Sequence, residues 1–268
     1  MNNDLHGVAQ RASRSSDFER IARIGYAASG VVHLLIAWIA GQVALGSSGE
    51  ADEAGALEQL GSSTGGSVLL WACAVGFAAL ALWHVVEAVV SQGGSSRDQL
   101  VDRVKAAGKG VLYGALAFTA FRVVTGAGAD GGETSSEATA TLMAAPAGRI
   151  LVGLLGLAVL GVGGYHVVKG AKRKFLEDLG GTGNREVSRA VTVLGVVGYV
   201  AKGAALAVMG GLFVTAALQA DPDQPTGLDA ALKTLGDQPF GVVLLLVVAV
   251  GLAAYGLYSF ARARYSRM

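Results

Sequence analysis

Long apolar runs separated by short polar segments dominate the chain. Each run is roughly 20 residues or longer, the length an α-helix needs to cross the hydrocarbon core of a bilayer. The six runs lie at about 21–45, 67–91, 106–126, 148–170, 191–218 and 240–261. The pattern predicts six transmembrane helices in an all-α, polytopic membrane protein.

A short amphipathic segment precedes every second apolar run. Before the last run, apolar residues recur at three- to four-residue spacing, as Leu228, Ala231, Leu232 and Leu235. That spacing places them on one face of a helix. We therefore expect short helices around 57–60, 142–143 and 228–235. Each is expected to dock where a glycine at the start of the next run permits close approach, namely Gly66, Gly148 and Gly241.

The same two-helix unit occurs three times along the chain. The stretch WHVVE at 83–87 aligns with YHVVK at 165–169, and Tyr258, Ser259 and Arg262 take the corresponding places in the last run. Further residues coincide between units: Leu60 with Leu142 and Leu235, Pro146 with Pro239, and Gly30 with Gly110 and Gly203. The predicted organisation is a tail at 1–20 and repeats at 21–91, 103–172 and 190–264.

Because each unit crosses the membrane twice, all three copies have the same orientation. Such parallel repeats are related by an axis along the membrane normal. The simplest arrangement is a pseudo-threefold ring of three two-helix hairpins.

Charge alternates along the polar segments. The N-terminal tail, the second and fourth connections and the C-terminus are rich in Lys and Arg. The first, third and fifth connections are acidic. The positive-inside rule then places both termini and the second and fourth connections in the cytoplasm. Asp52, Asp130 and Asp223 are predicted outside, and Arg97, Lys172 and Arg264 inside.

Composition supports lipid as the solvent of this chain. It is 52% hydrophobic and only 15% charged, whereas about 25% charged residues is typical of soluble domains. The formal net charge is +1, and no nucleic-acid partner is expected. One cysteine, Cys73, cannot form an intrachain disulfide or a thiolate metal site.

Several short motifs recur at equivalent places in the units. They are Gly25-Tyr26, Gly108-Lys109-Gly110, Gly198-Tyr199, Pro239-Phe240-Gly241, Tyr255-Gly256 and Ala263-Arg264. With these motifs the chain, from about Arg20 to its end, resembles the membrane proteins of domain of unknown function 1206 (DUF1206). The first unit departs most, because it lacks the Pro-Phe-Gly turn. The resemblance implies a multipass bacterial membrane protein and brings no catalytic residue with it.

Ionisable residues inside the predicted spans are candidate functional residues. They gather in the cytoplasmic half: His33, His84, Glu87, Lys109, His166, Lys169 and Lys202. In one interpretation, these side chains reach the membrane surface and Glu87 pairs with Lys109 or Lys105. In the other, His33, His84, Glu87, His166 and Lys202 line a vestibule open to the cytoplasm and relay protons or gate on pH.

A haem between His33 and either His84 or His166 is a third alternative. No helix carries a second histidine at helical spacing, and no cofactor or metal is expected. The chain lacks the Gly-x-Ser-x-Gly, His-Glu-x-x-His and Walker motifs, so no enzyme is expected. The sequence favours a channel or carrier for a small solute or proton. The alternative is an accessory or scaffolding subunit that binds another membrane protein or a second copy of itself.

Overall fold

Long and short helices alternate along the chain in the computed structural model, which describes residues 16–90, 96–128, 131–181 and 184–266. The helices are α2 Ser16–Ala44, α3 Glu53–Gly61, α4 Gly66–Val90, α5 Ser96–Val124, α6 Gly131–Ala144, α7 Gly148–Ala171, the 3-10 helix η1 Lys174–Asp178, α8 Arg185–Gln219, α9 Leu228–Gly236 and α10 Gly241–Tyr265. These residues form no strand, only an isolated bridge between Leu179 and Ser266. The predicted all-α class is confirmed. Most of the predicted tail and Asp130 lie outside the described residues.

Five of the long helices in the described ranges are long and apolar enough to cross a membrane: α2, α4, α7, α8 and α10. The 29-residue α5 is not among them; it carries Arg103, Lys105, Lys109 and Arg122 within its length. The five apolar helices indicate a multipass membrane protein.

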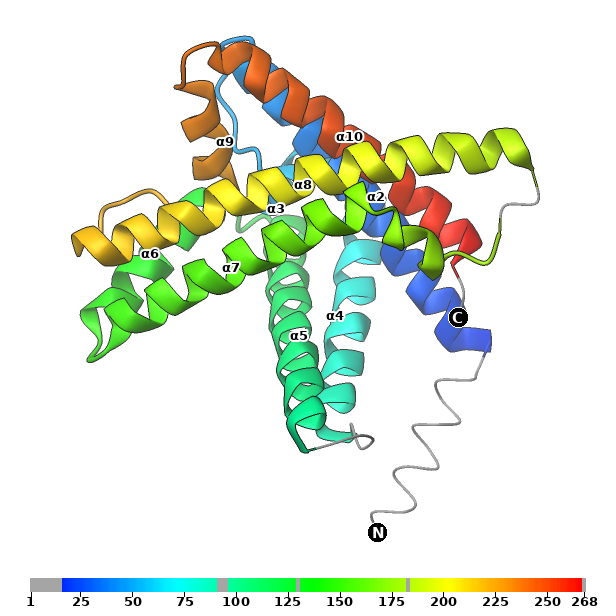
Figure 1. Cartoon of the computed structure of the whole chain (residues 1–268), viewed down its shortest axis with the longest axis horizontal. Coiled ribbons are helices and arrows are strands. Elements are labelled where there is room, and N and C mark those ends of the chain that lie inside the picture. The colour runs from blue at the N-terminus through cyan, green and yellow to red at the C-terminus, as the bar shows by residue number, and fades with distance from the viewer. Residues whose placement is uncertain (1–15, 91–95, 129–130, 182–183, 267–268) are drawn as a thin grey trace.

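The long helices pack in three pairs, α2 with α10, α4 with α5, and α7 with α8. In Figure 1 these pairs run in three different directions. Each pair joins helices from different repeats, and α2 with α10 joins the first repeat to the third.

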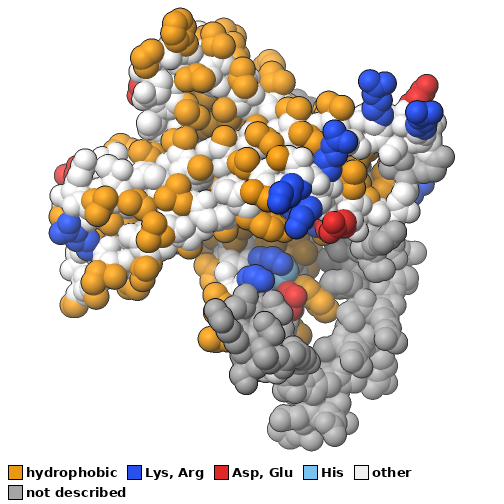
Figure 2. Space-filling view, in the orientation of Figure 1, with side chains coloured by type: hydrophobic (Ala, Val, Ile, Leu, Met, Phe, Trp, Pro, Cys, Tyr) orange, Lys and Arg blue, Asp and Glu red, His pale blue; other side chains and the backbone are white. Residues whose placement is uncertain are grey.

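Lys and Arg lie mostly toward one end of the long helices. We call the starts of α2, α5 and α8 and the ends of α4, α7 and α10 the charged ends. Figure 2 shows Lys and Arg gathered over one of them, where α7 ends and α8 begins.

Glycines at one repeat position lie where the helices of each pair cross, and the approach is closest at Gly203 and Gly30. Gly30 of α2, Gly110 of α5 and Gly203 of α8 face equivalent carbonyls of α10, α4 and α7. These carbonyls belong to Gly256, Ala81 and Gly163. A Cβ would lie 3.0, 3.6 and 2.6 Å from these oxygens, respectively. Small residues at such crossings let helix backbones approach closely in membrane proteins.

The predicted short helices are confirmed as α3, α6 and α9, which we call the cap helices. Each is followed by a turn into α4, α7 or α10, and the first helical glycine lies against the carbonyl of Leu60, Leu142 or Gly236. A Cβ at any of these glycines would overlap that oxygen. The apolar faces of α3 and α9 are buried: Leu57, Leu60, Ala231 and Leu232 are at most 6% exposed.

The main hydrophobic core lies beneath the cap helices. Ile36 of α2, Leu57 of α3, Phe77 of α4, Leu232 of α9 and Leu252 of α10 belong to one buried cluster. Val32, Ile39, Cys73 and a set of Ala and Leu side chains complete this core. The described part of the chain is therefore closely packed and apolar on the side of the cap helices.

One residue in each turn has a left-handed backbone: Gly65 with φ 78°, Ala147 with φ 62° and Phe240 with φ 62°. A residue with a Cβ is strained there by about 1 kcal/mol. Replacing Ala147 by glycine is therefore expected to raise the free energy of unfolding by about 0.5–1 kcal/mol. The control is Ala158→Gly within α7, which should lower it by about 1 kcal/mol. Thermal unfolding in detergent measures both, and equal shifts would contradict the prediction.

Candidate functional site

His33 and Lys202 meet inside the protein, although they belong to the first and third repeats. The Lys202 ammonium donates to Nε2 of His33 at 2.8 Å, and Nδ1 of His33 donates to the Ser29 carbonyl at 2.7 Å. A carbonyl only accepts, so this contact fixes the proton on Nδ1 and leaves Nε2 as the acceptor for lysine. His33 is 7% exposed, and the pair is held within packed helices.

An aromatic ring provides the other side of this pair. The Lys202 ammonium lies 4.3 Å from the centre of the Tyr255 ring, and the His33 ring lies 4.7 Å from the same ring. The face of an aromatic ring attracts a cation. Lys202 is thus held by an imidazole and a ring face, two uncharged groups.

Three tyrosines and Phe175 extend the site toward the charged ends. We call Tyr199, Tyr255, Tyr258 and Phe175 the aromatic cluster. The Tyr199 ring lies within 5.3–5.5 Å of the other three rings and 5.6 Å from the ring of His166. The cluster therefore connects the His33–Lys202 pair with His166.

Glycines explain how the cluster forms. A Cβ at Gly198 would lie 2.5 Å from the Cα of Tyr255, and a Cβ at Gly195 would overlap the ring of Phe175. The motif Gly198-Tyr199 thus marks the place where α8 crosses α10. The sequence pattern identified this motif but did not include Tyr199 or Tyr255 among the candidate residues.

His166 and Lys169 lie at the end of α7 beside the aromatic cluster. His166 bonds to the Val162 carbonyl of its own helix. The Lys169 ammonium pairs with Asp178 of η1 at 2.7 Å, and Arg262 of α10 reaches the same carboxylate at 3.6 Å. The sequence pattern did not single out this pairing, because Asp178 lies in the charged connection and its helix partners depend on how that connection folds.

His84 and Glu87 form a separate pair one helical turn apart on α4. Nδ1 of His84 lies 2.7 Å from the Glu87 carboxylate. The His84 ring stacks on Tyr113 of α5, with centres 5.5 Å apart and planes 8° from parallel. Lys109 lies exposed on α5. That Glu87 and at least two of His33, His84 and His166 share one cavity stays a prediction.

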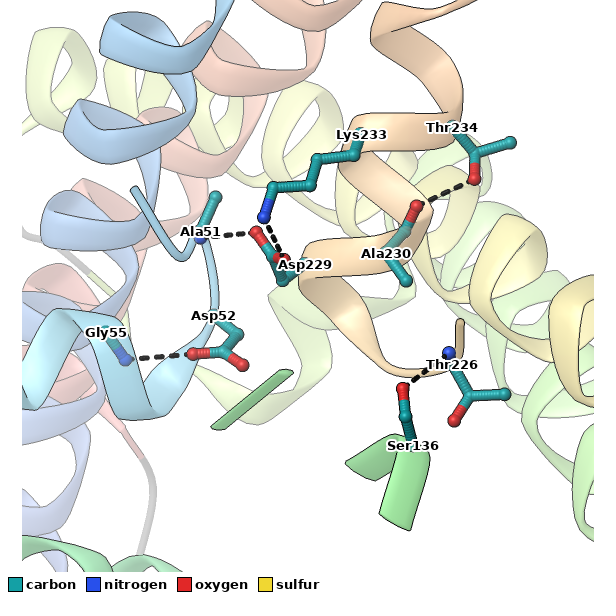
Figure 3. A network of polar contacts seen from close by, with 9 residues as sticks. All are labelled: Ala51, Asp52, Gly55, Ser136, Thr226, Asp229, Ala230, Lys233 and Thr234. Atoms are coloured by element: carbon teal, nitrogen blue, oxygen red, sulfur yellow. Dashed lines mark hydrogen bonds and ion pairs between the residues drawn. The ribbon is translucent and has the colours of Figure 1, made fainter. Parts of the chain in front are cut away.

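A second polar network joins the cap helices (Figure 3). The buried carboxylate of Asp229 accepts from the Ala51 N–H at 2.9 Å and pairs with Lys233 at 2.7 Å. Thr226 bonds to Thr139 at 3.0 Å, which ties the turn before α9 to α6. These contacts link all three repeats at the cap helices, over the apolar core.

Asp52 caps the start of α3, where its carboxylate accepts from the Gly55 N–H at 2.9 Å. Burial raises the pKa of Asp52 to about 7; the Gly55 N–H opposes this shift, and the carboxylates of Glu53, Glu50 and Asp229 add to it. Asp52 therefore binds a proton more tightly in the native state than in the unfolded chain.

Replacing Asp52 by asparagine is expected to raise the free energy of unfolding at pH 8 by about 1–3 kcal/mol, with little change at pH 4. The folded pKa lies above the unfolded one, so the stability from protonated Asp52 is lost as pH rises through about 7. Thermal unfolding between pH 4 and 8.5 measures this. The exposed Asp223, changed to asparagine, is the control, and equal pH profiles for the two variants would contradict the prediction.

Among the described residues, no group of three His, Cys, Asp or Glu side chains could hold a metal ion. What the site offers chemically is the part-buried ammonium of Lys202, an imidazole whose Nε2 accepts a hydrogen bond, and phenol groups. These groups can carry protons or attract an anion.

Comparison with known proteins finds a family model and a similar curated protein that cover most of the chain. The family model described as Domain of Unknown Function (DUF1206) matches three times, at residues 24–91, 104–173 and 197–266. The chain is 31% identical over 253 residues to "Uncharacterized protein YxxB" of Bacillus subtilis (strain 168), covering 93% of this chain and 92% of that protein. No solved structure matches.

Proposed function

The chain belongs to the family described as Domain of Unknown Function (DUF1206), and from this membership together with the His33–Lys202 pair we propose that it is a non-catalytic membrane protein that moves protons or a small solute. It resides in the bacterial inner membrane with both termini in the cytoplasm. Six helices cross the bilayer, arranged as three parallel repeats around a pseudo-threefold axis.

The length of α5 supports six spans. At 1.5 Å per residue, its 29 residues extend about 43 Å, more than the roughly 30 Å of a hydrocarbon core. Its charged side chains lie mostly in the first half and at Arg122 near the end, where they can reach the membrane surface. Both termini are rich in Lys and Arg, which places them on the same side of the membrane. An even number of spans agrees with this.

The glycine contacts support the pseudo-threefold axis. Equivalent glycines of α2, α5 and α8 face equivalent carbonyls of α10, α4 and α7. The pairing of α2 with α10 closes the cycle between the first and last repeats. A ring of three units is the simplest arrangement in which α2, α5 and α8 each have such a neighbour.

The observation that carries the proposed function is the position of Lys202. Placing a lysine within a membrane span costs free energy. Such residues in membrane proteins pair with one another or face pathways for ions and protons. Here the hydrogen-bond partner is the imidazole of His33, a group that can carry a proton on either ring nitrogen. The aromatic cluster leads from this pair toward the charged ends, while the apolar core separates it from the cap helices.

The experiment is proton or solute flux in liposomes driven by a pH gradient. Lys202→Met is expected to abolish flux, whereas Lys109→Met, at the equivalent repeat position but exposed, should retain it. Equal flux in the two variants at equal reconstitution would contradict the role of Lys202. Flux no greater than in empty liposomes for the unmodified protein would contradict transport itself.

An accessory or scaffolding role is the second candidate. It is favoured by Gly161 and Gly164 of α7, which are exposed and where an added Cβ would meet no heavy atom within 4 Å. Open glycines on a span allow another helix to approach closely. Purification with native partners in mild detergent distinguishes this role, because a scaffold would retain a stoichiometric membrane partner or a second copy of itself.

A further inference from the structure

An apolar groove runs along the outside of α7 and α8 near the start of α7. Its volume is about 580 Å³, and Ile150, Gly153, Leu157, Val214 and Leu218 line it. Ile150, Leu157 and Leu218 are between 58% and 73% exposed, so the groove opens away from the protein. Both helices are long and apolar enough to cross a membrane, and lipid chains are therefore the surroundings of this groove.

A cation borders the groove at one end. Arg149 belongs to its lining, and the guanidinium donates through Nη2 to the Leu218 carbonyl at 2.6 Å and through Nε to the Ala217 carbonyl. An arginine side chain has five N–H groups, so these two contacts leave three for a ligand. The two carbonyls hold the guanidinium at the end of α8, beside the groove.

The length of the groove fits half of a bilayer. Leu157 lies eight residues beyond Arg149 on α7, a distance of about 12 Å along the helix. Half of a typical hydrocarbon core is about 15 Å thick. An acyl chain in the groove would thus place its headgroup at the depth of Arg149.

We propose that this groove binds an anionic phospholipid, with one acyl chain between α7 and α8 and the phosphate on Arg149. Arginine pairs with phosphate through two parallel hydrogen bonds, and the apolar side chains match the acyl chain. Two N–H groups of Arg149 are used in capping the end of α8. This capping role does not explain why an open apolar groove lies beside the guanidinium. This inference does not depend on the proposed transport.

The test compares phosphatidylglycerol with phosphatidylcholine of the same acyl chains, added to the full-length protein in detergent. Native mass spectrometry counts the retained lipids, and thermal unfolding measures the stabilisation. Phosphatidylglycerol is expected to stabilise the protein more and to remain bound. Equal effects of the two lipids would overturn the proposal.

Two variants with matched controls locate the site. Gly153→Leu fills the groove and leaves Arg149 with its two carbonyl contacts, since a Cβ there meets Ala217 only at 3.4 Å. It should weaken phosphatidylglycerol retention about tenfold, whereas Gly161→Leu, on an open face of the same helix, should not. Arg149→Gln should remove the preference for the anionic lipid, and Arg122→Gln, at the end of α5, should keep it.

The two variants also keep the test decisive if one fails to fold. Should Arg149→Gln unfold through loss of the α8 cap, Gly153→Leu alone decides, because it alters neither charge nor cap. A Gly153→Leu protein that retains phosphatidylglycerol as well as the Gly161→Leu protein would overturn the proposal.

Discussion

Replacing Gly203 by leucine is expected to destabilise the protein by about 3 kcal/mol or more, or to prevent folding. A Cβ at this position would lie 2.6 Å from the Gly163 carbonyl oxygen and 2.8 Å from the Val167 nitrogen. Both are backbone atoms of α7, so the contact is relieved only by moving one helix away from the other. The extensive packing of α7 against α8 would be lost with it.

Gly211→Leu is the matched control for this prediction. Gly211 lies on α8 as well, and a Cβ there has no neighbouring atom within 4 Å. The same side chain in the same helix should therefore change stability little. Melting temperature in detergent, with size-exclusion chromatography for the folded fraction, measures both variants. If the two variants melt together, the close crossing of α7 and α8 is wrong.

Removing His33 alone is expected to cost more than removing His33 and Lys202 together. His33→Leu leaves the ammonium inside the protein with only the ring of Tyr255, at a cost of about 2–4 kcal/mol. Lys202→Met leaves a neutral imidazole without its donor, which costs about 1–2 kcal/mol. In the double variant neither group is stranded, so its stability should lie above that of His33→Leu.

A double-mutant cycle measures this coupling directly. Unfolding titrations of the three variants and the unmodified protein give the interaction free energy, which should be about 1–3 kcal/mol for residues in contact. The pair His84 and Lys202, which lie in separate groups of contacts, provides the comparison cycle and should be close to additive. Additivity within His33 and Lys202 would show that the pair does not form.

Local patterns were enough to predict the helices and the repeat. The apolar runs predict long helices because a span must satisfy its own backbone hydrogen bonds in lipid. The spacing of Leu228, Leu232 and Leu235 predicts α9 because one face of a short helix must be buried. The glycines at 66, 148 and 241 are recognisable because the same turn recurs in each unit, and the motifs identify the family.

The helix ends were less well predicted. The fifth apolar run was expected over 191–218, whereas α8 spans Arg185–Gln219. Its first turn is polar, with Asn184 as the capping residue, so hydropathy does not mark it. Similarly, α2 and α5 begin in charged sequence, before the apolar run that defines their spans.

The partners of the polar residues were decided only by the tertiary structure. Five of the seven candidates fall into three separate pairs: His33 with Lys202, His84 with Glu87, and Lys169 with Asp178, which was not a candidate. His33 and Lys202 are 169 residues apart, and they meet because α2 and α8 both pack on α10. The hydropathy along one helix determines how deep in the membrane a side chain lies, because this depth depends on the solvent around the helix. Which side chain it touches depends on the rotation and crossing of helices, which only their packing against one another determines.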